Sequence, residues 1–537
     1  MTAVGGELVA HAAEPEPSLG IITSAAYVDS ELMAEFGRIP PSFLPLGHER
    51  IFTRQVAALH QLVDRVVLTL PESFSVPPSD AAWLADHDVS VLMLPDGLSL
   101  AQSIHHALVL SGARGEVRLL HGDTLFLDPL PRELDVVSVG PAPDFYRWAE
   151  MRSTGQRPTF QVGEGADLEV LSGFFAFSSA VDLLIATLQR RGDFLGALSS
   201  YSESSPLVPV PVAGWLDFGH LQTYYAAKSA ASIARSFNSL DFSRHSVRKR
   251  SSDSGKIEAE ARWFESIPPQ LRLFTPAFLG RDGDGYRLAY EASPTLHELF
   301  VFGNLSLRTW TKVVDVCHGF LEECARLAEG TSEVPGLDEL VIEKTAQRLE
   351  QWSAASGMHL DEPLHYAGSP LPSLSSIVER CSGIVSAGTP IPGVMHGDFC
   401  FPNVFFDYQD ELVRVVDPRG RAGDGTPSIF GDLRYDLAKF NHSLEGYDYI
   451  LAGRYGLTGS GEPSLCLEFP DASVARGIRS VMSVQSLGGV PIEQDEITAL
   501  TVLLFLSMLP LHADRPDRQQ AFFANALRLY SELEASA

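Results

Sequence analysis

The sequence predicts an α/β chain in two parts, one built on a largely parallel sheet and one of the α+β class with two lobes. Between residues 19 and about 230, short apolar runs such as "LGIITSA" and "RVVLTL" alternate with helical patterns such as "SLAQSIHHALVLSG". This rhythm is typical of a parallel sheet covered by helices. Strand patterns then give way to long amphipathic helical patterns from residue 306 onward, which predicts a small β-rich lobe followed by a helical lobe.

Length and charge limit the possible partners. The chain has 537 residues, of which 45% are hydrophobic and 20% charged, and at roughly 150 residues per domain it has room for three or four compact units. Forty Lys and Arg residues against 68 Asp and Glu residues give a formal net charge of −28. Because this charge repels polyanions and acidic lipid surfaces, we expect neither a nucleic-acid partner nor a membrane partner.

The cysteines and both ends of the chain favour a cytoplasmic protein. Five cysteines without a C-x-x-C pair predict neither a disulfide framework nor a zinc cluster, and they suit a reducing compartment. Residues 1–18 lack the basic and apolar regions of a signal peptide, so we expect a flexible tail. The run "ALTVLLFLSMLPLHA" is interrupted by Pro510 and is shorter than the roughly 20 residues of a membrane span, which predicts a buried helix.

A change of pattern near residue 230 predicts the domain boundary. The segment "YYAAKSAASIARSFNSLDFS" passes from an Ala-rich helical pattern into a strand pattern. We therefore expect one domain at 19–230 and a second at 231–537. In the second domain, residues 235 to about 305 should form strands and one helix, and residues 306–537 should form helices interrupted by two strands.

The stretch "VMHGDFCFPNVFFD" carries the most specific chemical pattern. Pro402 prevents a continuing helix, so a loop should bring Asp398 and Asn403 together. The run "LVRVV" should hairpin back beside "VFFD" and end at Asp417. Phosphoryl transfer needs a carboxylate to accept the proton of an attacking hydroxyl, and an Asn and a second Asp to hold Mg²⁺. These three residues fit those roles better than the alternative, a turn Asp beside a surface Asn.

Three motifs in this region resemble the aminoglycoside phosphotransferase and choline kinase group of the protein-kinase-like fold. They are "HGDFCFPN" at 396–403, "VVDPRG" at 415–420 and "GDLRYDLAKF" at 431–440. The resemblance implies ATP as co-substrate, a catalytic base at Asp398 and magnesium ligands at Asn403 and Asp417. It also implies structural roles at the site for His396 and Asp436. Asp417 is followed by Pro-Arg-Gly where protein kinases carry Phe-Gly, so regulation by a Phe flip is not expected.

Such a fold also needs a cation for the α- and β-phosphates of ATP and a carboxylate to hold that cation. "HSVRKRSS" is predicted as a strand and "SGKIEAEARWFESI" as a helix, and we take Lys249 and Glu260 as the pair. Lys256 is a competing cation, and a solvated surface pair is the alternative. "YRLAYEASPTLHEL" at 286–299 resembles the hinge whose backbone would bind adenine.

Two acidic residues at strand ends point to a second site in the first domain. "EVRLLHGDTLF" stops at Asp123, and "GWLDFGHLQTYY" carries Asp217 just before a helix. Two such carboxylates can share a metal bound to a nucleoside triphosphate. Together with "LPDGLSLAQSIHHAL", they resemble the sugar-1-phosphate nucleotidyltransferases, a Rossmann-like, GT-A-like α/β fold. The resemblance implies that Asp123 and Asp217 bind the metal and that Gly97 and Leu98 lie beside the nucleotide and sugar.

The resemblance is weakest at the phosphate loop. The nucleotidyltransferases open with a Gly-rich loop ending in Arg and then place a Lys before "LLPV", whereas this chain reads "SAAYVDSELMAEFGRIPPSFLPLG". Gly37 and Arg38 could supply the phosphate-facing turn and its charge, but Pro41 and Ser42 stand where the Lys is expected. Loss of that cation removes several kcal/mol of charge stabilisation. Nucleotidyl transfer and a binding or scaffolding role therefore both stay open for this domain.

Three functional hypotheses follow. In the first, the second domain uses ATP and Mg²⁺ to phosphorylate a sugar, amino sugar or amino alcohol. The first domain then uses a second nucleoside triphosphate to activate the phosphorylated product, for polysaccharide or secondary-metabolite precursors. The alternatives are a kinase with a non-catalytic sugar-nucleotide-binding domain, and a nucleotide-binding pseudoenzyme. The acidic average composition hints at a cationic acceptor. The oligomeric state stays open.

Overall fold

The computed structural model describes residues 16–536 with several internal gaps. The residues outside the description are 1–15, 143–146, 155–156, 164–168, 234–239, 244, 329–333, 460–464, 482–484 and 537. Most of the predicted tail at 1–18 therefore lies outside the described residues. We refer to residues 16–233 as the N-terminal part and to residues 240–536 as the C-terminal part.

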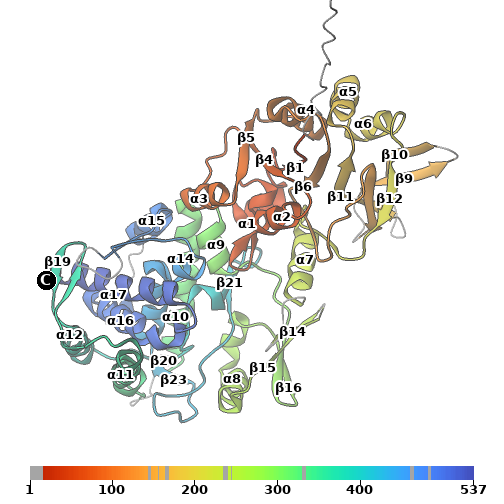
Figure 1. The fold of residues 1–537 in the computed structure, drawn as a ribbon. Coiled ribbons are helices and arrows are strands. Elements are labelled where there is room, and N and C mark those ends of the chain that lie inside the picture. Colours follow the sequence, from red (N-terminus) through yellow and green to blue (C-terminus); the bar gives the residue numbers. More distant parts are fainter. Residues whose placement is uncertain are drawn as a thin grey trace, which may run out of the picture.

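The N-terminal part is a mixed sheet with helices on both faces (Figure 1). Its strands are β1 (Leu19–Thr23), β4 (Arg65–Pro71), β5 (Val89–Leu94), β6 (Val117–His121), β8 (Val136–Pro141), β9 (Trp148–Thr154), β10 (Arg157–Gly163), β11 (Glu169–Phe177) and β12 (Val208–Pro211). The strand order is β10-β9-β11-β6-β1-β4-β5, with β8 between β11 and β12. The strands β6, β1, β4 and β5 run parallel, while β11 is antiparallel to β6. The predicted parallel sheet is thus present, with an antiparallel extension.

Smaller elements complete this part. The helices are α1 (Ser30–Phe36), α2 (Ile51–Leu59), α3 (Pro78–Asp86), α4 (Leu100–Ser111), α5 (Ala180–Arg190), α6 (Phe194–Tyr201) and α7 (Leu221–Ile233). The short strands are β2 (Pro45–Leu46), β3 (Glu49–Arg50), β7 (Thr124–Phe126) and β13 (Trp215–Asp217). Because β13 pairs antiparallel with β7, the end of β13 lies beside the turn that follows β6.

Alternation along the parallel strands fills two hydrophobic cores. Ile21 and Val67 face a core shared with α4, α5 and α6. Ile22 and Leu68 face a second core, which includes α1 and α2 and continues into the C-terminal part. The parallel sheet is therefore buried on both faces, and one of its cores is common to both parts of the chain.

The C-terminal part begins with a small antiparallel sheet in the order β14-β15-β17-β16. Its elements are β14 (Leu240–Phe242), β15 (Ser246–Arg250), α8 (Ser254–Ser266), β16 (Phe278–Asp282), β17 (Gly285–Ala289) and α9 (Leu296–Phe302). The sequence predicts one helix here, and α9 is a second. All seven residues of α9 are buried, so its sequence "LHELFVF" lacks the solvent-facing polar stripe by which an amphipathic helix is recognised.

Helices dominate the rest of the chain. They are α10 (Leu307–Arg326), α11 (Lys344–Ser356), α12 (Leu374–Ala387), α13 (Arg434–His442), α14 (Asp448–Leu451), α15 (Ser473–Val481), α16 (Gln494–Ser507) and α17 (Pro516–Ser536). Helix α16 contains most of the apolar run and packs against α11, α12, α13 and α17, so it is the buried helix that the sequence predicts. Among the described residues, no helix has both the length and the apolar character needed to cross a bilayer.

Short strands interrupt these helices more often than predicted. The strands are β18 (Leu364–Tyr366), β19 (Ser369–Leu371), β20 (Pro392–Val394), β21 (Val404–Asp407), β22 (Leu412–Val415), β23 (Phe430–Asp432), β24 (Gly456–Thr458), β25 (Cys466–Glu468), β26 (Ser486–Leu487) and β27 (Val490–Pro491). The predicted hairpin is β21 with β22, which pair antiparallel. The others have two or three residues each, too few to show a period.

A buried charged cluster joins the two parts. Arg50 Nη2 lies 2.9 Å from Asp80 Oδ2, and the other oxygen of Asp80 contacts Arg454 of the C-terminal part. Arg50 Nη1 also donates to the carbonyl oxygen of Phe302 at 2.6 Å. Burial lowers the pKa of Arg50 to about 10, although Asp80 opposes the shift. The Arg50 guanidinium therefore stays charged at neutral pH and depends on Asp80 for compensation.

We predict that Asp80→Ala destabilises the protein strongly. The change leaves the buried Arg50 guanidinium without its carboxylate, and breaking a buried pair in this way costs about 3–5 kcal/mol. Asp86→Ala removes an exposed carboxylate from the same helix, and its free energy of unfolding should stay within about 0.5 kcal/mol of wild type. Urea denaturation followed by circular dichroism measures both. Equal stability of the two variants would contradict the role of Asp80 in joining the two parts of the chain.

Candidate functional site

The loop between β20 and β21 is held by a carboxylate at the start of α13. Asp436 accepts hydrogen bonds from the backbone N–H groups of His396 and Gly397 at 2.8 and 2.7 Å. Gly397 has φ +78°, and a Cβ atom there would lie 2.5 Å from Arg419 Cβ, so only glycine fits. Burial raises the pKa of Asp436 to about 7, against the effect of the two N–H groups. The ring of His396 is fully buried, which suits its predicted structural role.

Asp398 projects from this loop between two partners. Its Oδ1 lies 2.9 Å from Lys439 Nζ, and its Oδ2 accepts from Asn403 Nδ2 at 2.9 Å. Burial by itself would raise the pKa of Asp398, but Lys439 and Asn403 hold it below its ordinary value. Asp398 is therefore an ionised carboxylate that can accept a hydrogen bond from a hydroxyl group. The sequence analysis missed Lys439, although it follows Asp436 by three residues on α13 within the quoted motif "GDLRYDLAKF".

Lys249 contacts two carboxylates, one on helix α8 and one just after strand β22. Its Nζ lies 2.8 Å from Glu260 Oε2 on α8 and 2.8 Å from Asp417 Oδ1, just after β22. Burial opposes its charge, but Asp417 and Glu260 outweigh burial and raise the pKa of Lys249. The competing cation, Lys256, is 3.8 Å from Glu260 Oε1. Lys249 is thus the closer partner of Glu260.

Asn403, Asp417 and Lys249 line one cavity of about 330 Å³. The amide nitrogen of Asn403 donates to Asp398, which leaves the amide oxygen as its ligand atom. Asp417 has φ +60°, an uncommon conformation that is often found at functional sites. An amide oxygen and a carboxylate suit Mg²⁺. Lys249 Nζ contacts Oδ1 of Asp417, so a cation would bind Oδ2 or take the place of Lys249 at Oδ1.

The rest of this cavity is mostly apolar. Its wall includes residues 288–291 from the predicted hinge, together with Val247, Phe405 and Val416. Apolar walls with a few polar groups at one end are typical of small-molecule sites. The cavity therefore has an apolar region for a flat ring and a charged end at Lys249 and Asp417.

The N-terminal part also contributes to this cavity. His48 and Lys228 line it. His48 Nδ1 lies 2.8 Å from Nε2 of His297. The other ring nitrogen of His297, Nδ1, lies 2.5 Å from Asp448 Oδ1. Lys228 Nζ lies 2.7 Å from Glu298 Oε2. The sequence analysis identified none of these groups, because their partners lie far away along the chain.

A second pair of carboxylates meets at the edge of the parallel sheet. A Cβ atom built on Gly219 would lie 2.9 Å from Asp123 Oδ2 and 3.3 Å from Asp217 Oδ1, so the two side chains flank the same backbone. Burial, followed by the charge of Asp123, raises the pKa of Asp217 to about 7. Within the described residues, the Oδ2 atom of Asp217 is buried and makes no hydrogen bond.

These two carboxylates fit a divalent cation that also binds phosphate oxygens. Mg²⁺ commonly uses one or two carboxylates, with waters and substrate phosphates as its other ligands. The unpaired buried oxygen of Asp217 is the atom that such a cation would satisfy. In the part of the chain that the structure describes, no group of three or more His, Cys, Asp or Glu side chains is arranged to hold a metal.

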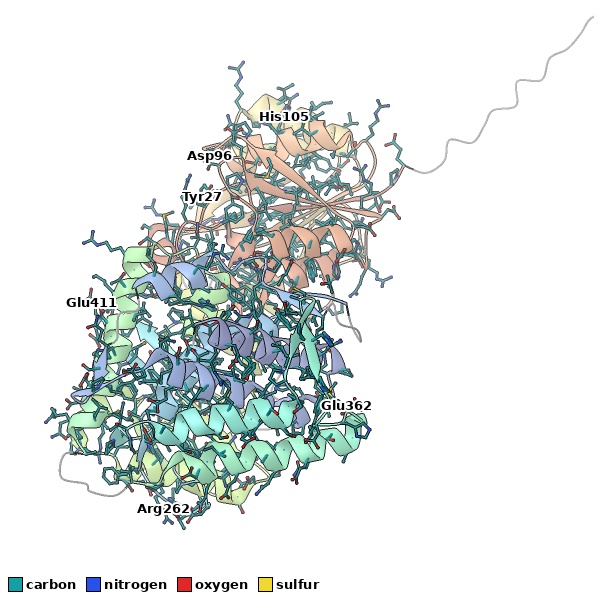
Figure 2. The ribbon with its side chains drawn as sticks, turned by 90° about the vertical axis from the view of Figure 1, so that its left-hand side faces the viewer. Tyr27, Asp96, His105, Arg262, Glu362 and Glu411 are labelled. Carbon is teal, nitrogen blue, oxygen red and sulfur yellow. The ribbon has the colours of Figure 1, made fainter. Side chains whose placement is uncertain are left out.

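The other predicted residues of the N-terminal site lie near the ends of the parallel strands. Arg38 Nη2 lies 3.1 Å from Asp96 Oδ2, and its guanidinium carbon is 3.8 Å from the ring centroid of Tyr27. Figure 2 shows Tyr27 and Asp96 on the surface of the N-terminal part. Gly97 has φ +80° in an exposed turn, and Leu98 follows it half-buried. The charge of Arg38 is thus already compensated by Asp96.

Gly37, predicted in a phosphate-facing turn, packs against the C-terminal part of the chain. A Cβ atom there would lie 2.1 Å from the carbonyl oxygen of Asn304, because Gly37 packs against the backbone between α9 and α10. Ser42, at the position of the expected Lys, is fully buried and donates to Ser24 Oγ at 2.8 Å. Gly37 therefore serves in packing, and the position of the expected Lys carries a neutral, hydrogen-bonded Ser42.

Comparisons with known proteins give weak structural likenesses alone. No protein-family model matches the chain, and no curated protein matches it. A putative glucose-1-phosphate thymidylyltransferase from Bacillus anthracis has 16% identity and a TM-score of 0.34, covering 42% of this chain and 98% of its own. CTP:phosphocholine cytidylyltransferase from Streptococcus pneumoniae has 10% identity and a TM-score of 0.32, covering 40% and 98%. Likeness at this level carries no inference about activity, which depends on the chain's own residues.

We predict that Mn²⁺ binding at Asp123 and Asp217 depends on pH. Because the pKa of Asp217 is about 7, a cation must displace a proton below that pH, so affinity should rise about tenfold per pH unit up to pH 7 and then level off. Electron paramagnetic resonance titrations of Asp417→Asn, which lacks the carboxylate of the other candidate metal site, measure this. The further change Asp217→Asn should weaken binding and abolish the pH dependence. Affinity that is constant from pH 5.5 to 7 would contradict the assignment.

Proposed function

We propose that the C-terminal part is a protein-kinase-like phosphotransferase that uses ATP and Mg²⁺ to phosphorylate a small hydroxylated molecule. In this proposal the domain begins near residue 231 and has a small lobe at 235–305 and a helical lobe at 306–537. The observation that carries the proposal is the position of Lys249, within 2.8 Å of both Glu260 and Asp417, in a cavity that also contains Asn403. Asp398 contacts Asn403 beside this cavity.

Each side chain has a defined task in this proposal. Lys249, oriented by Glu260, would bind the phosphates of ATP, while the apolar wall receives the base. Asn403 and Asp417 would hold Mg²⁺, which supplies charge neutralisation when bound. Asp398 orients the acceptor hydroxyl and accepts its proton as the oxygen bonds to the γ-phosphorus and the bond to ADP breaks. Lys439 keeps Asp398 ionised, and Asp436 fixes the loop.

We predict that Asp398→Asn lowers ADP formation by about 10²- to 10⁴-fold, the range for loss of a general base. Binding of a nonhydrolysable ATP analogue should change less than about twofold, because Asp398 is not an assigned ATP ligand. A coupled assay over sugars, amino sugars, amino alcohols and their phosphates measures ADP formation.

Asp361→Asn is the control, because it removes an exposed carboxylate from the same part of the chain. Its ADP formation should equal that of wild type. Equal rates in wild type and Asp398→Asn would contradict the role of Asp398. ATP binding without ADP formation for any acceptor would support the pseudoenzyme alternative.

We propose nucleotidyl transfer as a second activity, located at 19–230. The unpaired buried oxygen of Asp217 beside Asp123 favours a metal bound to a nucleoside triphosphate. The neutral Ser42 and the compensated Arg38 favour a sugar-nucleotide-binding role instead. The chemistry links the two parts, because a kinase product is a phosphomonoester and can attack the α-phosphate of a second nucleoside triphosphate.

We predict pyrophosphate release when the protein meets CTP, UTP, dTTP or GTP together with sugar phosphates and Mg²⁺. Asp217→Asn should reduce the rate by about 10²-fold or more, through loss of charge stabilisation at the α-phosphate. Asp398→Asn should leave this rate unchanged, because Asp398 belongs to the other site. A phosphate assay coupled to pyrophosphatase measures the release. No release across the panel from a protein with intact kinase activity would assign 19–230 to binding alone.

A further inference from the structure

A second cavity, of about 360 Å³, opens beside the proposed catalytic base. Asp398 and Asp417 both line it, and so does Lys439. The cavity that contains Lys249 shares Asp417 with it. Asp398 lines the second cavity and does not line the cavity that contains Lys249, so a molecule bound in the second cavity would contact Asp398 directly. This is the position of a phosphoryl acceptor, so the inference below depends on the proposed phosphotransferase function.

The wall of the second cavity is strongly cationic. Its basic side chains are Lys256, Lys344, Arg348, Arg419, Arg421 and Lys439. Its carboxylates are Glu260, Asp398 and Asp417. Each of these three carboxylates lies within 2.9 Å of Lys249 or Lys439. The negative charges of the wall are thus already compensated, and most of its positive charges are not.

Four of the cations form an uncompensated group, which we call the cationic wall. Within the described residues, no carboxylate lies within 4.0 Å of the charged nitrogens of its members, which are Lys344, Arg348, Arg419 and Arg421. Arg348 Nη1 donates to the carbonyl oxygen of Ser507 at 3.1 Å, and Arg419 Nε donates to that of Arg421 at 3.2 Å. These bonds fix two of the guanidinium groups while leaving most of their N–H groups available.

The pKa of Lys344 reflects this local charge. Burial lowers it to about 7, and the charges of Arg419, Arg348, Lys439 and Arg421 add to the shift. Packing cations together without counter-ions is unfavourable, and such a cluster becomes favourable when an anion binds. The electrostatic potential in this cavity is therefore opposite in sign to the net charge of the chain, −28. The cationic acceptor that the acidic average composition predicts does not suit this cavity.

We propose that the phosphoryl acceptor is a small hydroxylated anion, whose phosphate or carboxylate group binds the cationic wall while its hydroxyl contacts Asp398. Arginine forms paired, charge-assisted hydrogen bonds with both kinds of anionic group. A cationic amino alcohol or amino sugar would meet several uncompensated positive charges. The cavity therefore selects sugar phosphates, sugar acids or similar molecules over neutral and cationic acceptors.

The first test measures binding without turnover. Asp398→Asn protein, saturated with Mg²⁺ and a nonhydrolysable ATP analogue, is titrated calorimetrically with inorganic phosphate. We expect binding that the double change Lys344→Gln and Arg348→Gln weakens at least about tenfold. Arg262→Gln, which removes an exposed charge elsewhere on the surface (Figure 2), should have no effect. Phosphate binding that is absent, or equal with and without the double change, would overturn the proposal.

The second test measures specificity with matched acceptors. Glucose, glucosamine, glucose 6-phosphate and glucuronate share one scaffold, and ribose and ribose 5-phosphate form a second set. We expect kcat/KM to be at least about tenfold higher for the anionic members, and the double variant to lose this preference while KM for ATP stays within about twofold. The phosphate and carboxylate members show which anionic group is preferred. A preference for neutral or cationic members, or a rise in KM for ATP alone, would overturn the proposal.

The two tests separate this inference from the phosphotransferase function. If no acceptor yields ADP, the proposed function fails, and the binding test still decides whether the cationic wall holds an anion. If neutral acceptors are phosphorylated efficiently and phosphate binding is unaffected by the double change, the kinase stands and the anionic acceptor is excluded.

Discussion

The C-terminal cleft depends on the ammonium group of Lys249. It lies 2.8 Å from carboxylates on both of its sides, Glu260 on α8 and Asp417 after β22. Glu260 and Asp417 together offset the free-energy cost of burying the Lys249 ammonium group. Trp263, on the same helix as Glu260, donates to the carbonyl oxygen of Met395 at 2.9 Å and so fixes α8 against the loop that carries Asp398. In the proposed mechanism, a magnesium nucleotide replaces Asp417 as the partner of Lys249.

The two parts of the chain share a hydrophobic core and the wall of one cavity. A hydrophobic core runs through both parts, and His48 and Lys228 line the cavity that contains Lys249. Residues 231–537 alone would therefore lack part of the wall of their own proposed nucleotide site. His297 and Glu298 line the same cavity and contact His48 and Lys228 across the boundary.

Sequence reasoning reached those features whose residues lie close together along the chain. Asp398, Asn403 and Asp417 span only twenty positions, and the hairpin between Asn403 and Asp417 follows from its turn and strand patterns.

The cationic wall was missed because α11 and residues 419–421 are separated by more than sixty positions and meet only in the folded chain. The net charge of −28 also conceals a local positive potential, because an average carries no positional information. Helix α9 was missed for a local reason, since a fully buried helix shows no amphipathic period.

A crystal structure with Mn²⁺ and a nonhydrolysable ATP analogue, with anomalous scattering to locate the metal, tests whether Lys249, Asn403 and Asp417 form a nucleotide site. We predict a Mn²⁺ peak between the Asn403 amide oxygen and the Asp417 carboxylate, with Lys249 contacting the phosphates and Asp398 beside the γ-phosphate. A structure in which Lys249 still binds Asp417, with the metal and the nucleotide bound only at Asp123 and Asp217 of the N-terminal part, would contradict it.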